Sequence, residues 1–390
     1  AGAAAAEGAV GSTGACAAAG ADVGSGRGKL YWILNFPNKL QRANLDGSEV
    51  EDIVEGLSHP QALAIDDVRG KLYWSDSGNL ADSLHRANLD GSDAEELPVE
   101  APAAWGLAVD VAGEKLYWTE LDAGRIRRSN LDGTEVEVIL EGVLSEPSGL
   151  ALDVAGGYIY WCDYGSGKIQ RAPLRKPEAV QDIVTLAELA RPTGLALDAL
   201  GGKIYWADSG GFRVQRAGLD GGDVEDVVAA GVKDPHGIAV DAEGGQLFWT
   251  ATGTVYEGKK QPSSAALSGG KIQRLRFRGP DGAGAGGSEA TPAAPEEVVS
   301  TGRSRPVAVA VVGARSSGCA QVGARRLRVG DLVELTFGLG EADDAMRGPL
   351  RPREVGGISS DDKSDQPFMV SIGGQEWWYR ADALQLRAAR

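Results

Sequence analysis

The amino-acid sequence predicts an all-β protein that consists of a closed six-bladed β-propeller and a small second β domain. Three observations lead to this fold class. An aromatic residue followed by Trp recurs six times, each repeat of this pair brings four short strand-like runs, and one copy of the first run stands after all the others. A period of about 40–45 residues is typical of propeller blades and of some solenoids, so the content of each unit must decide between them.

The repeated aromatic pair marks the second strand of each unit. Its Trp residues follow one another at intervals of 42 to 45 residues, at Trp32, Trp74, Trp118, Trp161, Trp206 and Trp249. A strand that is covered on both faces can use so large a side chain to fill the wedge between neighbouring sheets. We therefore expect the six Trp side chains to be buried between blades.

One unit contains four strand-like runs and no run long enough for a helix. The first is GLALD at 149–153, the second is YIYWCD at 158–163, and the third is KIQRAPL at 168–174. In most copies an L-D-G turn follows the third run and leads to a fourth run, such as VEVIL at 136–140. Four short strands joined by tight turns predict a four-stranded antiparallel blade.

The displaced copy of the first strand predicts how the ring closes. Five copies precede their second strands, at 59–66, 104–110, 146–153, 191–198 and 234–241, whereas RPVAVAVV at 305–312 follows everything else. The first blade starts at Lys29 without a first strand of its own. We expect 306–312 to return to it and to remove two exposed sheet edges. A solenoid would need polar capping repeats, and neither end of the array has one.

The remaining chain divides into three further parts. Residues 1–28 form a low-complexity Ala/Gly tract, 29–315 the propeller, 316–326 a linker, and 327–390 a second domain. In this last part, LRVGDLVEL at 327–335 has strand alternation, and two more strands flank a G-G hairpin near the end. The polar tract 356–366 lies between them.

The repeats resemble the YWTD repeats of six-bladed propellers in low-density-lipoprotein receptors, the class B repeats of that family. The YWTD motif of the family reads YWSD, YWTE, YWCD and YWAD in blades two to five. The family's later Arg recurs at Arg42, Arg86, Arg128, Arg171, Arg216 and Arg274, and its L-D-G turn at Asp46, Asp90, Asp132 and Asp220. The chain departs from the pattern at Leu34 and Ala251, which replace the acid, and at 174–176, which read L-R-K.

The resemblance implies a protein-binding propeller in an extracellular or secretory-lumen location; an assembly in an organelle or in the cytoplasm is the alternative. Residues 327–390 resemble one small SH3-like barrel of the Mind-bomb and HERC type. Such barrels bind peptides through aromatic grooves, which singles out Trp377, Trp378 and Tyr379 as binding residues.

Two rings of repeated carboxylates are expected to be structural. One ring ends the second strands, at Asp76, Glu120, Asp163 and Asp208, and the other begins the turn after the first strands, at Asp66, Asp110, Asp153, Asp198 and Asp241. A residue that is present in nearly every repeat serves the repeat itself. We expect these side chains to cap backbone amides or to pair with Arg residues.

Partner binding is expected where the copies differ. The position that opens each innermost strand, at the rim of the central channel, reads Gln61, Trp105, Ser148, Thr193, His236 and Val307. Loops that follow the second strands share this face and bring Phe36, Arg125, Tyr164 and Phe212, and a long insert in blade six brings Lys259 and Lys260. Trp is favoured at binding hot spots, although Trp105 could instead plug the channel.

The sequence predicts no catalytic residues, no cofactor and no metal site. Some six-bladed propellers, such as lactonases, gather acids, Asn and His at the channel, but this rim offers one His and no Glu. The leading hypothesis is therefore a protein-binding scaffold that uses the channel face and the barrel. A structural subunit of a large assembly is the second hypothesis, and a channel-face hydrolase is the third.

Composition narrows the class of partner. A formal charge of −16 argues against nucleic acid and favours basic protein partners. No apolar run approaches the roughly 20 residues of a transmembrane helix. Cys162 is expected to be a buried thiol, whereas Cys16 and Cys319 could form a disulfide across the closure or remain two thiols in a reducing compartment.

Overall fold

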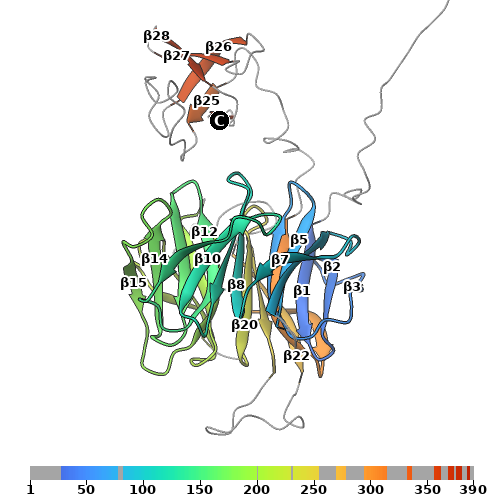
Figure 1. Ribbon diagram of the computed structural model, residues 1–390. Helices are drawn as coiled ribbons and strands as arrows, with labels where there is room; N and C mark the ends of the chain where they lie inside the picture. The colour runs from blue at the N-terminus through green and yellow to red at the C-terminus, as the bar shows by residue number, and fades with distance from the viewer. Residues whose placement is uncertain are drawn as a thin grey trace, which may run out of the picture.

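The computed structural model describes residues 28–77, 82–199, 201–229, 232–253, 269–277 and 294–313, together with the backbone of five strands between 332 and 386. The first six ranges fold into six antiparallel sheets of four strands each, arranged around a central axis (Figure 1). Lys259, Lys260, Cys16, Cys319 and the linker 316–326 lie outside the described residues.

The blades follow one another in chain order, and the strands of each blade are named from the innermost to the outermost. Blade one is β24 (Arg305–Val312), β1 (Lys29–Asn35), β2 (Lys39–Asn44) and β3 (Glu51–Val54), and blade two is β4 (Pro60–Asp66), β5 (Lys71–Ser77), β6 (Asp82–Asn88) and β7 (Glu95–Glu100). Blade three is β8 (Ala104–Asp110), β9 (Lys115–Glu120), β10 (Arg125–Asn130) and β11 (Glu137–Glu141), and blade four is β12 (Pro147–Asp153), β13 (Tyr158–Asp163), β14 (Lys168–Pro173) and β15 (Gln181–Thr185). Blade five is β16 (Pro192–Asp198), β17 (Lys203–Asp208), β18 (Arg213–Gly218) and β19 (Glu225–Val228), and blade six is β20 (Pro235–Asp241), β21 (Gln246–Ala251), β22 (Gly270–Arg276) and β23 (Glu296–Gly302).

The predicted closure of the ring is confirmed. Strand β24 pairs antiparallel with β1, with Lys29 opposite Val312 and Asn35 opposite Arg305. The orange end of the propeller chain thus lies beside its blue beginning (Figure 1). Because the innermost strands of neighbouring blades contact one another all the way round, including β20 with β24 and β24 with β4, the six blades form a closed ring.

The aromatic pair explains why the unit repeats. All six Trp side chains are buried, at most 1% exposed. Tyr and Trp are adjacent in the strand, so they point to opposite faces of the sheet. At the seam between blades four and five, for example, Tyr160 packs in one apolar cluster with Trp206 of the next blade, and Tyr205 does so with Trp249 at the following seam. Each blade thus buries its faces only against copies of itself.

A backbone latch joins several neighbouring blades near the L-D-G turns. Arg42 of blade one donates a hydrogen bond to the Leu89 carbonyl of blade two at 3.1 Å, and Arg274 of blade six donates to the Leu45 carbonyl of blade one at 3.0 Å. The turn also approaches the preceding blade closely, since a Cβ on Gly47, whose φ is 82°, would clash with the Val298 carbonyl. The latch therefore needs both the Arg and the glycine turn.

The C-terminal strands form a separate five-stranded antiparallel sheet. It contains β25 (Leu332–Leu335), β26 (Val355–Asp361), β27 (Phe368–Ile372), β28 (Gln375–Tyr379) and β29 (Leu384–Leu386), in the order β28-β27-β26-β25-β29. The predicted hairpin is confirmed, because Ile372 pairs with Gln375. The sequence missed β26, which lies largely within the polar tract at 356–366. The SH3-like closure into a barrel stays a prediction.

Candidate partner-binding site

The ring of second-strand carboxylates holds the loops of one propeller face. The carboxylate of Asp163 accepts hydrogen bonds from the Ser145 and Ser166 amides at 2.9 and 3.0 Å. Asp208 accepts from the Arg191 amide at 2.8 Å and from Arg213 Nε at 3.0 Å. Since the start of each innermost strand lies beside the end of its second strand, these carboxylates anchor the chain where it enters the channel rim. The predicted structural role is confirmed.

The second ring of carboxylates is also structural. Asp110, Asp153, Asp198 and Asp241 each accept a hydrogen bond from the amide of the Gly three residues later, at 2.7–2.9 Å. These turns join the first and second strands and lie at the opposite end of the blades from the rim. We call the end with the rim, which carries the loops between second and third strands and the loops between blades, the channel face.

Hydroxyl groups in the second strands link some neighbouring blades. Ser75 Oγ in blade two accepts a hydrogen bond from the Ala62 amide and donates to the Ala104 carbonyl of blade three at 2.8 Å. Thr119 of blade three does the same with Gly106 and with the Ser148 carbonyl of blade four. A buried carbonyl at each seam is satisfied in this way.

In blades four and five the hydroxyl comes from the first strand instead. The corresponding second-strand residues are Cys162 and Ala207, and Cys162 makes only a long contact from Sγ to the Gly194 carbonyl at 3.8 Å. Ser148 donates to the Pro192 carbonyl at 3.0 Å, and Thr193 donates to the Pro235 carbonyl at 3.1 Å. Both were predicted as rim residues, but Ser148 is 1% and Thr193 6% exposed, and their hydroxyl groups are hydrogen-bonded to the next blade.

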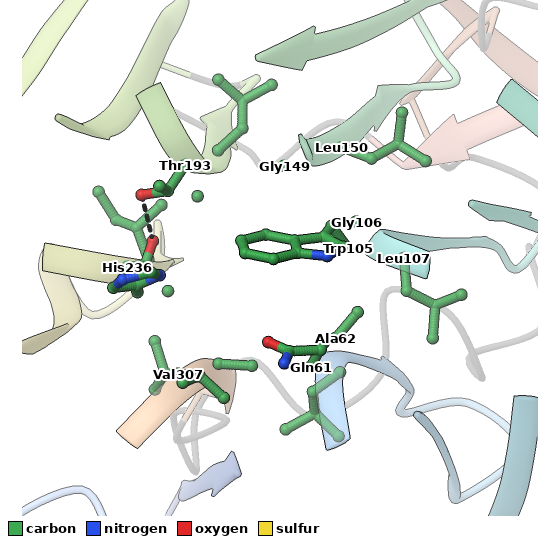
Figure 2. A pocket seen from close by; sticks show the side chains of 17 residues that line it. Gln61, Ala62, Trp105, Gly106, Leu107, Gly149, Leu150, Thr193, His236 and Val307 are labelled. Atoms are coloured by element: carbon green, nitrogen blue, oxygen red, sulfur yellow. Dashed lines mark hydrogen bonds between the residues drawn. The ribbon is translucent and has the colours of Figure 1, made fainter. Parts of the chain in front are cut away.

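The three remaining large polar or aromatic rim residues belong to blades whose second strand supplies a hydroxyl. Gln61, Trp105 and His236 stand in blades two, three and six, where the second strand carries Ser75, Thr119 and Thr250. All three line a cavity of about 80 Å³ that is bounded by all six innermost strands. Figure 2 shows the Trp105 indole lying across this cavity, pointing toward His236 on the opposite wall, with Gln61 beside it.

His236 is held by a carboxylate that the sequence did not single out. Asp234, 1% exposed, places Oδ1 3.5 Å from His236 Nε2 and accepts a hydrogen bond from Thr252 Oγ1 at 2.6 Å. Burial raises the pKa of Asp234, but its contacts with His236 and Thr252 and the charge of Arg305 outweigh burial and leave this pKa below the usual aspartate value. The signal for it in the sequence was the loss of the repeat acid at Ala251 in the same blade.

The predicted loop residues fall into two groups. Phe36 and Phe212 are exposed, by 60% and 41%, and both have positive φ angles, 64° and 54°, which are unusual for a bulky side chain. The other two are engaged: the ring of Tyr164 lies under the Arg191 guanidinium at 5.5 Å, and Arg125 forms an ion pair with the buried Glu120.

The described ranges contain no cluster of three or more His, Cys, Asp and Glu side chains arranged to hold a metal ion. In the same ranges, no helix has the length and apolar character needed to cross a bilayer.

The comparisons with known proteins agree with the repeats and the fold. The model of the low-density lipoprotein receptor repeat class B matches residues 114–154 and 202–242. A chain in the crystal structure of a nidogen/laminin complex is similar over 73% of this chain and 98% of its own length, with a TM-score of 0.57 and 19% identity. TolB from Acinetobacter baumannii is similar over 73% of this chain and 67% of its own, with a TM-score of 0.55 and 14% identity.

The chain therefore carries YWTD repeats of class B in a six-bladed propeller. At these levels of identity, the two solved structures show a shared fold alone.

Proposed function

We propose that this chain is a protein-binding module without enzymatic activity of its own, and that the channel face of its propeller receives the partner. The observation that carries the proposal is that the side chains of Gln61, Trp105 and His236 face one cavity, whereas Ser148 and Thr193 at the corresponding positions bond to the next blade. In blades two and three, the hydroxyl groups of Ser75 and Thr119 in the second strands make the contact to the next blade that Ser148 and Thr193 make elsewhere. In blade six, the Thr250 hydroxyl accepts a hydrogen bond from the Gly237 amide of the same blade. The side chains of Gln61, Trp105 and His236 converge on one cavity, and an indole at such a position is typical of binding hot spots.

The chemistry of the cavity favours binding over catalysis. Thr193 carries the one hydroxyl group among the described residues that line the cavity. This hydroxyl donates to backbone carbonyls and not to the imidazole of His236, whose Nε2 lies beside Asp234. A general base needs a positioned group from which it removes a proton. The similar chain from the nidogen/laminin structure was crystallised in a protein complex, which supports the same class of function.

The C-terminal sheet is proposed as a second contact module. Trp377, Trp378 and Tyr379 fall on β28, and an SH3-like barrel would use such aromatic residues to hold a peptide. Their side chains lie outside the described residues, so this part of the proposal rests on the sequence.

The Trp105→Ala variant tests the channel face. We expect the wild-type chain to retain a partner in a native pull-down followed by mass spectrometry, and the variant to lose at least about 2 kcal/mol of binding free energy to that partner. Val68→Ala is the matched control, because Val68 is 71% exposed on the turn between β4 and β5, at the opposite end of the blades. If Trp105 only plugs the channel, Trp105→Ala will lower the melting temperature and leave the partner bound.

A further inference from the structure

The loops that lead from one blade into the next divide the channel face by charge. Three consecutive loops, whose described parts are 186–191, 232–234 and 303–304, bring Arg191, Lys233 and Arg303, and Arg305 follows directly as the first residue of β24. The other three loops, at 55–59, 101–103 and 142–146, contain Glu55 and Glu146 and no Lys or Arg. We call Arg191, Lys233, Arg303 and Arg305 the basic sector.

Among the Lys and Arg residues that the structure describes, these four differ from the majority because they form no ion pair with a described carboxylate. Arg86 pairs with Glu95 at 2.5 Å and Lys168 pairs with Asp182 at 2.6 Å, as do most cations on the third strands. In the basic sector, Lys233 and Arg303 are exposed, and Arg305 Nε is buried without a hydrogen-bond partner in the structure. Two carboxylates stand in these loops: Glu188 is exposed, and the buried Asp234 contacts His236 and Thr252 and also feels the charge of Arg305.

Apolar side chains accompany this charge over blade five. Leu189 is 78% exposed on the loop before β16, and Phe212 is 41% exposed on the loop after β17. The two loops touch, because a Cβ on Gly210 would clash with the Leu189 carbonyl. Arg191 extends from the first loop over the ring of Tyr164 in blade four. An exposed Leu and Phe on touching loops beside an unpaired Arg are typical of a contact surface rather than of a solvated loop.

We infer that the partner docks on this side of the channel face through an acidic segment that carries an apolar side chain. The basic sector attracts the carboxylates, and Leu189 and Phe212 contact the apolar residue. The net charge of −16 favours a basic partner for the molecule as a whole, but the loops of this sector and the start of β24 bring four cations against the two carboxylates of Glu188 and Asp234. A contact depends on the potential of the surface that makes it, so the local charge decides the partner. The inference rests on the proposed function and specifies it.

Two labelled peptides test the charge of the partner in fluorescence-anisotropy titrations of the full chain. One alternates Glu and Asp with Leu and Phe, and the other has Lys in place of every acid. We expect the acidic peptide to bind at least about tenfold more tightly, and its affinity to fall as salt is added. Equal or tighter binding of the Lys peptide would overturn the inference. A third, acidic peptide has Ser in place of Leu and Phe; if it binds as tightly as the first, the surface attracts polyanions in general and the inference is also overturned.

A pair of double variants places the contact. Arg191→Glu with Lys233→Glu reverses two charges in the basic sector, and Lys176→Glu with Arg276→Glu reverses two exposed cations near the opposite end of the blades. We expect the first pair to weaken binding of the acidic peptide about tenfold and the second less than twofold, with a cooperative melting transition showing that both variants are folded. Equal losses overturn the inference. A partner that is lost in Trp105→Ala but unaffected by the first pair would leave the proposed function intact and overturn the acidic segment alone.

Discussion

Ser148 and Thr193 form in blades four and five the inter-blade bond that Ser75 and Thr119 form in blades two and three. The hydroxyl is needed at each of these seams, but the strand that supplies it can change. Where the second strand supplies it, the first-strand residue is released to face the channel, as Trp105 is. A structural requirement of one residue thus determines whether another residue can take part in binding.

The Thr193→Val variant tests this exchange of roles. It removes the donor to the Pro235 carbonyl while it keeps the shape of the side chain, so we expect the free energy of unfolding to fall by about 1–3 kcal/mol. Adding Ala207→Ser supplies a hydroxyl from the second strand, as in blade two, and should restore part of the loss. Urea unfolding measures all three proteins. A Thr193→Val protein as stable as the wild type would contradict the exchange.

The pKa of Asp234 makes a second prediction at this scale. Because the pKa is below its usual value in the folded protein, the carboxylate stabilises the fold above the unfolded-state pKa of about 3.9, and that stability is lost as the pH falls through the lower folded-state value. The Asp234→Asn variant has no carboxylate at this position, so it lacks this contribution to stability at every pH. We expect the difference in unfolding free energy between wild type and Asp234→Asn to shrink as the pH falls below the unfolded-state pKa of about 3.9. A constant difference would show that Asp234 acts only by packing.

At the scale of elements, the latch from Arg to the L-D-G turn follows the sequence closely. The Arg residues of blades one, two, four and six donate to the Leu carbonyl of the following turn, where L-D-G is present in each case. Blade four has L-R-K at that place, and Arg128 of blade three donates to the Tyr117 hydroxyl at 3.3 Å instead. The seam between blades three and four therefore has no such Arg bond among the described contacts, and the Thr119 hydroxyl and an apolar cluster join the two blades there.

Arg274→Ala and Arg216→Ala measure the latch. Each Arg pairs with a Glu of its outermost strand, Glu296 or Glu225, but Arg274 also donates to the Leu45 carbonyl across the closure. We expect Arg274→Ala to lower the free energy of unfolding by about 1–2 kcal/mol more than Arg216→Ala does, because a hydrogen bond from a charged donor is lost. Equal losses in chemical unfolding would mean that the carbonyl bond contributes nothing measurable.

At the scale of the molecule, the ring could be predicted from the sequence because the six copies of the repeat can be aligned with one another. The displaced RPVAVAVV matched the first strands so well that its return to β1 could be inferred from pattern alone. The sequence pattern did not show that Ser148 and Thr193 are buried. A hydroxyl at the rim position can face the channel or bond to the next blade, and only a comparison with the second-strand residue of the same blade separates the two roles. Asp234 was missed for a related reason: it lies before the first strand of blade six, at a position where the other blades have no repeated carboxylate.

Two truncations test the closure as a property of the whole ring. Chains that end at Gly313 and at Ser304 both lack the C-terminal sheet, but only the first retains β24. Without β24, β1 keeps β2 but loses its partner on the channel side along its whole length, and Val307 and Val309 leave the apolar clusters on either side of blade one. We expect the chain ending at Gly313 to unfold in one cooperative transition and the chain ending at Ser304 to lose that cooperativity and aggregate through the exposed edge. Identical calorimetric transitions for the two chains would mean that the ring holds without its returning strand, and the rim formed by all six innermost strands would then not depend on the closure.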